Sequence, residues 1–114
     1  MRFEVLSDAL IIGYTALEYG DPTMSIAHGR FIPATAYDTI KSKIIVARGN
    51  LPQDSLGLSI RLIDGEKLDS LTIHIEDYSE EIGEIEITVF MADYIAYEKY
   101  FSEHVLAYKN QFNE

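Results

Sequence analysis

Strict alternation of apolar and polar residues in the second half of the chain limits the possible folds more than any other feature. From Ile85 to Met91 every second residue is apolar, and Glu86 and Thr88 lie between them. The segments 58–62 and 71–75 repeat the pattern. A period of two places one set of side chains on each face of a strand. The pattern therefore predicts antiparallel strands with one buried face and one solvent-exposed face.

The first half also predicts strands, over residues 3–7, 10–15 and about 24–31. Turn-forming residues separate them, at Ser7-Asp8-Ala9 and at Gly20-Asp21-Pro22. The segment 10–15 is apolar on both faces, which predicts a central position in the sheet. Further along the chain, Asp64-Gly65 is a strong hairpin signal.

A first helix is predicted to begin at Thr35, whose side chain can cap it. Tyr37, Ile40 and Ile44 then follow at helical spacing. Gly49-Asn50 and Pro52 are expected to stop the helix. Its end stays open between residues 44 and 50, because the run beginning at Ile44 is β-branched and also suits a strand.

A second helix is predicted after Asp93, which can cap it. One helical stripe is expected to form its core face, and it comprises Tyr94, Tyr97, Phe101, Val105 and Tyr108. Tyr100 lies off this stripe and is predicted to be on the surface. The chain is thus expected to form a single α+β domain over residues 1–114. Its antiparallel sheet has about five to six strands, with two helices packed on it.

The charge of the chain limits its partners. Nineteen Asp and Glu residues outnumber nine Lys and Arg, so the net charge is −10 at pH 7. The excess is uneven, with −1 in residues 1–57 and −9 in residues 58–114. Nucleic acid and anionic membranes are disfavoured, because both need a basic surface. A basic protein or a cationic ligand is the favoured partner. No signal-peptide or membrane-spanning pattern is recognisable, so a cytoplasmic location is expected.

The densest negative charge lies between Glu76 and Glu86, which contains six acids and no base. Calcium-loop spacing is absent from this run. One interpretation is a docking patch for a cationic surface, with an aromatic anchor. Its candidate residues are Glu76, Asp77, Tyr78, Glu80, Glu81, Glu84 and Glu86. The alternative is a solvated loop that keeps a hairpin soluble.

A second candidate site lies between residues 17 and 33, where Glu18, Asp21, His28 and Arg30 occur close together. In an enzyme, Glu18 or Asp21 could orient His28 as a general base while Arg30 holds an anionic substrate. The alternative is a turn followed by a solvated strand face.

Sequence motifs for cofactors and metals are missing. The chain has no cysteine, no phosphate-binding glycine loop and no zinc-protease motif. Its three histidines lie on different predicted elements, which does not favour a metal site. No cofactor and no metal are therefore expected.

One segment, Leu17–Pro33, has the pattern L-E-x-G-D-P-x-M-x-x-A-x-G-x-F-x-P and is followed by Ala36-Tyr37. A second block covers His74–Ser79. With these blocks, about a quarter of the chain resembles small bacterial proteins of uncharacterised function. The resemblance implies a bacterial single-domain protein and transfers no activity.

These observations leave three functional hypotheses. The first is a small acidic protein-binding domain, of which the most concrete version is an immunity or antitoxin-type inhibitor docking on a basic toxin surface. The second is a small enzyme or small-molecule-binding domain, with its site around Asp21, His28 and Arg30. The third is a structural subunit of a homo-oligomer. The choice among them depends on which residues the fold brings together.

Overall fold

A computed structural model describes residues 2–47, 56–63 and 65–111. In chain order the elements are β1 (Phe3–Ser7), β2 (Leu10–Thr15), β3 (Tyr19–Asp21), the 3-10 helix η1 (Pro22–Met24), β4 (Ile26–Pro33), the 3-10 helix η2 (Thr35–Thr39), α1 (Lys41–Ala47), β5 (Leu58–Leu62), β6 (Ser70–Tyr78), β7 (Glu84–Met91), α2 (Tyr94–Tyr100) and α3 (Ser102–Asn110).

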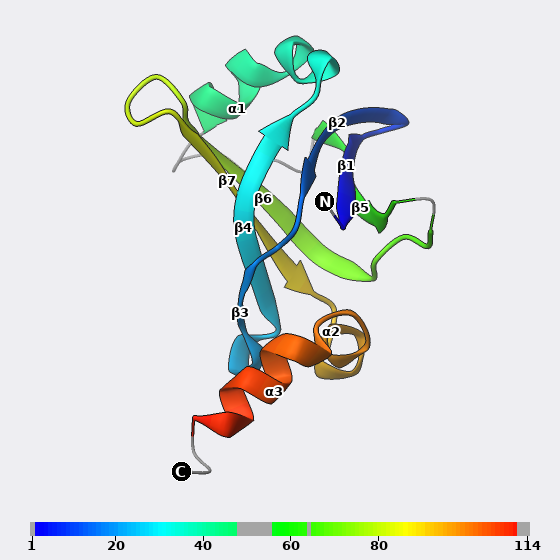
Figure 1. Cartoon of the computed structure of the whole chain (residues 1–114). Helices are drawn as coiled ribbons and strands as arrows, with labels where there is room; N and C mark the ends of the chain where they lie inside the picture. Colours follow the sequence, from blue (N-terminus) through cyan, green and yellow to red (C-terminus); the bar gives the residue numbers. More distant parts are fainter. Residues whose placement is uncertain (1, 48–55, 64, 112–114) are drawn as a thin grey trace.

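The strands form one antiparallel sheet in the order β5-β1-β2-β4-β7-β6, and β3 also pairs with β4 (Figure 1). This confirms the predicted α+β class. Within the described residues the sheet has seven strands, where about five to six were predicted. The same residues form three α-helices, where two were predicted. The central position predicted for residues 10–15 is confirmed, because β2 lies between β1 and β4.

The core lies on the inner face of the curled sheet. The residues predicted to face inward from Ile85 to Met91 are all buried. Helix α1 and η2 lie at one end of the sheet, and α2 and α3 lie at the other (Figure 1). Aromatic contacts attach both ends to the sheet: the rings of Phe31 and Tyr37 are 5.1 Å apart, and those of Phe3 and Phe101 are 5.7 Å apart.

The first helix differs from its prediction at the start. Thr35 does not cap it; the chain turns into η2 after Ala34, without a side-chain cap, and α1 begins only at Lys41. The backbone N–H of Ala34 donates to the carbonyl of Ile12, so a hydrogen bond to β2 fixes the position of the residue that precedes η2. The predicted core residues Tyr37, Ile40 and Ile44 are buried. The expected stop at Gly49, Asn50 and Pro52 lies outside the described residues.

The last helix begins as predicted, since the Asp93 side chain accepts a hydrogen bond from the Ala96 N–H. It is then interrupted at Phe101, whose φ of −128° is not helical. The interruption allows two consecutive aromatic residues to be buried. The prediction that Tyr100 lies on the surface is therefore wrong, since only 5% of it is exposed. On the predicted stripe Phe101 is fully buried, whereas Tyr94 is exposed.

The hairpin signal at Asp64-Gly65 is confirmed by the pairing that flanks it, although Asp64 itself lies outside the described residues. Arg61 and Lys67 form an antiparallel bridge, and the Leu68 N–H donates to the Ile60 carbonyl at 2.9 Å. Along its length β5 also pairs with β1, and an ion pair between Arg61 and Glu4 joins these two strands.

One burial prediction in a strand needs correction. Leu71 was predicted to be buried, but a bulge between Ser70 and Thr72 turns it outward, and 76% of it is exposed.

Candidate functional site

The outer face of β4, β7 and β6 carries polar cross-strand rows. His28 lies opposite Thr88, which lies opposite His74. In the next row Arg30 lies opposite Glu86, and Glu86 lies opposite Glu76. Alternation along each strand produces these rows, because the residues between them point into the core. The prediction that His28 and Arg30 share one strand face is confirmed.

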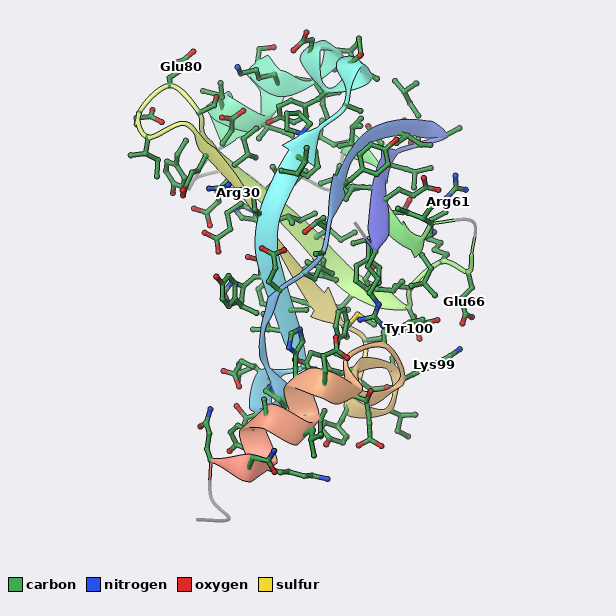
Figure 2. The ribbon with its side chains drawn as sticks, viewed as in Figure 1. Arg30, Arg61, Glu66, Glu80, Lys99 and Tyr100 are labelled. Carbon is green, nitrogen blue, oxygen red and sulfur yellow. The ribbon has the colours of Figure 1, made fainter. Side chains whose placement is uncertain are left out.

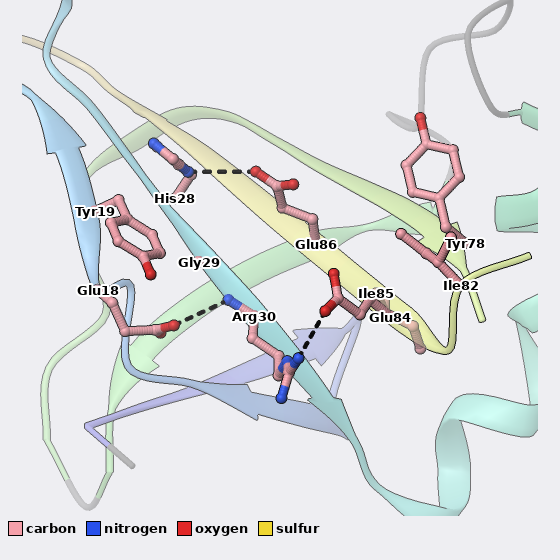
Figure 3. A pocket seen from close by; sticks show the side chains of 10 residues that line it. All are labelled: Glu18, Tyr19, His28, Gly29, Arg30, Tyr78, Ile82, Glu84, Ile85 and Glu86. Carbon is pink, nitrogen blue, oxygen red and sulfur yellow. Dashed lines mark hydrogen bonds and ion pairs between the residues drawn. The ribbon is translucent and has the colours of Figure 1, made fainter.

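A concavity of about 600 Å³ lies on this face, between β3 and the β6–β7 hairpin. Figure 3 shows its lining side chains, which come from β4 and β7 in the middle and from separate segments on either side. Those that carry its chemistry are Glu18, Tyr19, His28, Arg30, Tyr78, Ile82, Glu84 and Glu86.

The concavity joins parts of both candidate sites. It brings Glu18, His28 and Arg30 of one together with Tyr78, Glu84 and Glu86 of the other. Sequence reasoning did not select Tyr19 and Ile82 for either site. Both are large apolar residues within polar stretches of the sequence, and this signal could have identified them. The structure leaves both of them exposed.

One ion pair and one histidine–carboxylate contact link the two sets of residues. The Arg30 guanidinium donates to Glu84 Oε1 at 2.9 Å, and His28 Nδ1 lies 3.3 Å from Glu86 Oε1. His28 therefore pairs with Glu86, and not with Glu18 or Asp21 as the enzyme hypothesis required. Its ring stacks on Tyr19, with 5.4 Å between the ring centres. All these groups are partly or largely exposed to solvent, so each ion pair contributes little to stability.

A backbone irregularity positions Glu18. Leu17 has a φ of 47°, and its N–H donates to Thr15 Oγ1 at 3.1 Å. The Glu18 carboxylate then folds over β4 and accepts a hydrogen bond from the Arg30 N–H at 3.3 Å. Glycine is favoured beneath it, since a Cβ atom at Gly29 would lie 2.9 Å from the backbone nitrogen of Glu18 as well as 2.6 Å from its Oε1.

A residue of α3 stabilises the same backbone irregularity at Leu17. The Nε2–H of His104 donates to the carbonyl of Leu17 at 2.9 Å, and the His104 ring stacks on Phe101 at 5.5 Å. We expect His104→Ala to lower the free energy of unfolding by about 1–2 kcal/mol. The amide of Arg30 should also exchange its hydrogen faster, because Glu18 moves away from it. Hydrogen exchange followed by NMR measures this effect.

The matched control is His74→Ala, on the outer face of β6, which should leave exchange at Arg30 unchanged. Equal protection of the Arg30 amide in wild type and in His104→Ala would refute the positioning role.

Three other candidate residues do not line the concavity. Asp21 caps η1, because its carboxylate accepts from the N–H and the hydroxyl of Thr23. Glu80 and Glu81 lie exposed in the β6–β7 turn, outside the concavity. Figure 2 shows Glu80 at the tip of this turn, far from α2 and α3.

Asp77 is the exception in the acidic run, because it is buried. Its carboxylate accepts from the Tyr37 hydroxyl at 2.7 Å and from the Ser79 N–H at 2.8 Å. Burial raises its pKa, but the hydrogen bonds from Ser79 and Tyr37 and the nearby charge of Lys41 together lower the pKa below its usual value. Asp77 therefore joins η2 to β6 and cannot contact a partner.

The openness of the concavity limits its chemistry. Water reaches the ion-paired groups, so the site lacks the water-excluded, preorganised setting that strengthens catalytic electrostatics. Among the described residues, no group of three or more His, Asp or Glu side chains is placed to hold a metal ion. None of the helices in the described ranges is long and apolar enough to cross a membrane.

Comparison with protein-family models, curated proteins and solved structures yields no match.

Proposed function

We propose that this protein is a small acidic protein-binding domain that docks on a basic protein. We define its acidic surface as Glu76, Glu80, Glu81, Glu84 and Glu86, with Tyr78 and Ile82 among them. The observation that carries the proposal is the collection of these acids on one exposed face and its adjoining turn. Glu76 and Glu86 even lie directly opposite each other on neighbouring strands.

Like charges in directly opposed cross-strand positions destabilise a sheet. Within the chain, His28 contacts Glu86 and the Tyr78 hydroxyl donates to Glu76. A basic partner would offset the repulsion that remains and would be attracted by the same field. Tyr78 and Ile82 add apolar contact area to the acidic surface, as anchors at protein interfaces commonly do. The proposal gains physical support from this combination, because a surface needed only for solubility does not require a hollow with aromatic sides.

An immunity or antitoxin-type inhibitor in the cytoplasm is the most concrete version of this proposal. Such an inhibitor places carboxylates and aromatic rings over a cationic cleft. The acidic surface has both kinds of group, and its turn projects beyond the sheet (Figure 1).

The test is charge reversal with the triple variant Glu80→Lys, Glu81→Lys, Glu84→Lys. We expect about a tenfold or greater loss of a salt-eluted basic partner from the immobilised protein, because opposed charges are replaced by like ones. The measurement is capture from a lysate of the source organism at low salt, followed by a salt step and mass spectrometry.

A second triple variant, Asp69→Lys, Glu98→Lys, Glu103→Lys, is the matched control. It changes the net charge by the same amount on residues in or beside α2 and α3, and each triple includes one acid that is paired with an arginine. Equal retention of the partner by both triples would show that only net charge matters and would refute the docking surface. Capture of only further copies of the same chain on the immobilised protein would favour the homo-oligomer instead.

A second candidate function is small-molecule binding at the concavity. Its volume falls within the range of ligand sites, and Glu18, His28 and Arg30 converge there. In that case a ligand should raise the melting temperature of the wild type but not of His28→Ala, as thermal unfolding across a compound set would show.

A further inference from the structure

The net charge of the concavity favours one kind of ligand over another. Among the described side chains that line it, Glu18, Glu84 and Glu86 are carboxylates, and Arg30 is the only Lys or Arg. Three negative charges therefore face one positive charge, and His28 lies among them. An anion would meet net repulsion in this hollow, whereas a cation would be attracted.

The aromatic side chains indicate which kind of cation the concavity would bind best. Tyr19 is 62% exposed and is supported from behind by its stack on His28. Tyr78 lines the opposite side, near the turn. A flat cation can stack on such a ring while its N–H groups reach carboxylates, and guanidinium does both better than ammonium does.

The site already binds a guanidinium from its own chain. The Arg30 side chain is extended across the floor and donates to Glu84 at 2.9 Å, while Glu18 accepts from the Arg30 backbone (Figure 3). Both partners of the Arg30–Glu84 pair are more than half exposed, so this pair can open at little cost. Glu84 is thus shown to receive a guanidinium in this geometry.

We propose that the concavity is the seat for one arginine side chain of the basic partner, with its guanidinium on the exposed face of Tyr19 and its N–H groups toward Glu86, the carboxylate that His28 also contacts. This inference rests on the proposed docking function and specifies its central contact. Arg30 acts as an internal competitor, because it occupies Glu84 and reduces the negative charge that the incoming arginine meets.

The probe is N-acetyl-arginine amide, titrated into the 15N-labelled protein and followed by NMR. We expect weak, saturable shifts at the amides of Tyr19, Gly29 and Glu86, with a dissociation constant on the order of 10 mM. N-acetyl-citrulline amide has nearly the same shape without the charge and should cause no such shifts. N-acetyl-lysine amide should bind more weakly than the arginine compound.

Two charge-removing variants test the roles of Glu86 and Arg30 in opposite directions. Glu86→Gln should weaken binding of the arginine probe roughly two- to fivefold, and Arg30→Gln should strengthen it by a similar factor. Glu103→Gln, on α3, is the control and should change neither. Equal shifts with citrulline, or the same affinity in Glu86→Gln and wild type, would overturn the arginine seat.

The outcomes separate this inference from the proposed function. If the triple variant of the turn loses a basic partner but the arginine probe does not bind, the docking surface stands and the seat is refuted. If the probe binds as expected but retention of a partner does not depend on the turn, the seat stands and the docking function is refuted.

Discussion

Replacing Phe101 with alanine is expected to lower the free energy of unfolding by about 4 kcal/mol, the largest effect that we predict for a single substitution. Phe101 is fully buried, and its ring lies 5.7 Å from that of Phe3 and 5.1 Å from that of Tyr97. The substitution would leave a cavity where α2 and α3 join the sheet. Urea denaturation should show a lower midpoint with an unchanged slope.

Ile95→Ala on α2 is the control for this prediction. Ile95 is also a large apolar residue of the same region, but 81% of it is exposed. Its replacement should change stability by no more than about 0.5 kcal/mol. A loss below about 1.5 kcal/mol for Phe101→Ala would contradict the view that this ring attaches the C-terminal helices to the core.

Asp77→Ala is expected to be the second most damaging substitution, at about 3 kcal/mol. It leaves the Tyr37 hydroxyl and the Ser79 N–H without their shared acceptor in a buried position. Tyr37→Phe removes one of these hydrogen bonds and should cost about 1–2 kcal/mol. Glu80→Ala, an exposed acid three residues away, should be nearly neutral. If Asp77→Ala and Glu80→Ala have equal stability, Asp77 does not join η2 to β6.

The lowered pKa of Asp77 also predicts a pH dependence. Its ionised form is favoured by folding, so its contribution to stability is complete above the unfolded pKa of about 3.9. The contribution is lost as the pH falls through the lower folded pKa. Wild type should therefore lose more stability than Asp77→Asn when urea denaturation is repeated from about pH 5 to pH 2. Parallel pH profiles for the two proteins would contradict this expectation.

The candidate site shows which features residue alternation predicted correctly and which it missed. Alternation correctly placed His28 and Arg30 on one face and identified the wet face of β7, because burial of one sheet face determines both. The predicted segment ended at residue 75, so Asp77 was grouped with its exposed acidic neighbours. Strand β6 extends to Tyr78, which places Asp77 on the inner face with Ile73 and Ile75, and its partner Tyr37 is 40 residues away. A run of like charges along the chain thus divides between the core and the surface once the strand is formed.

The sequence by itself determined most of the strands, the buried face of β7 and the cap at Asp93, because each depends on residues within a few positions. Only the tertiary structure decided which strands pair, where the last helix is interrupted and which residues meet in the concavity. The contact between Arg30 and Glu84 spans 54 residues. Such contacts are set by the register of strands far apart in the chain, and a local pattern contains no information about that register.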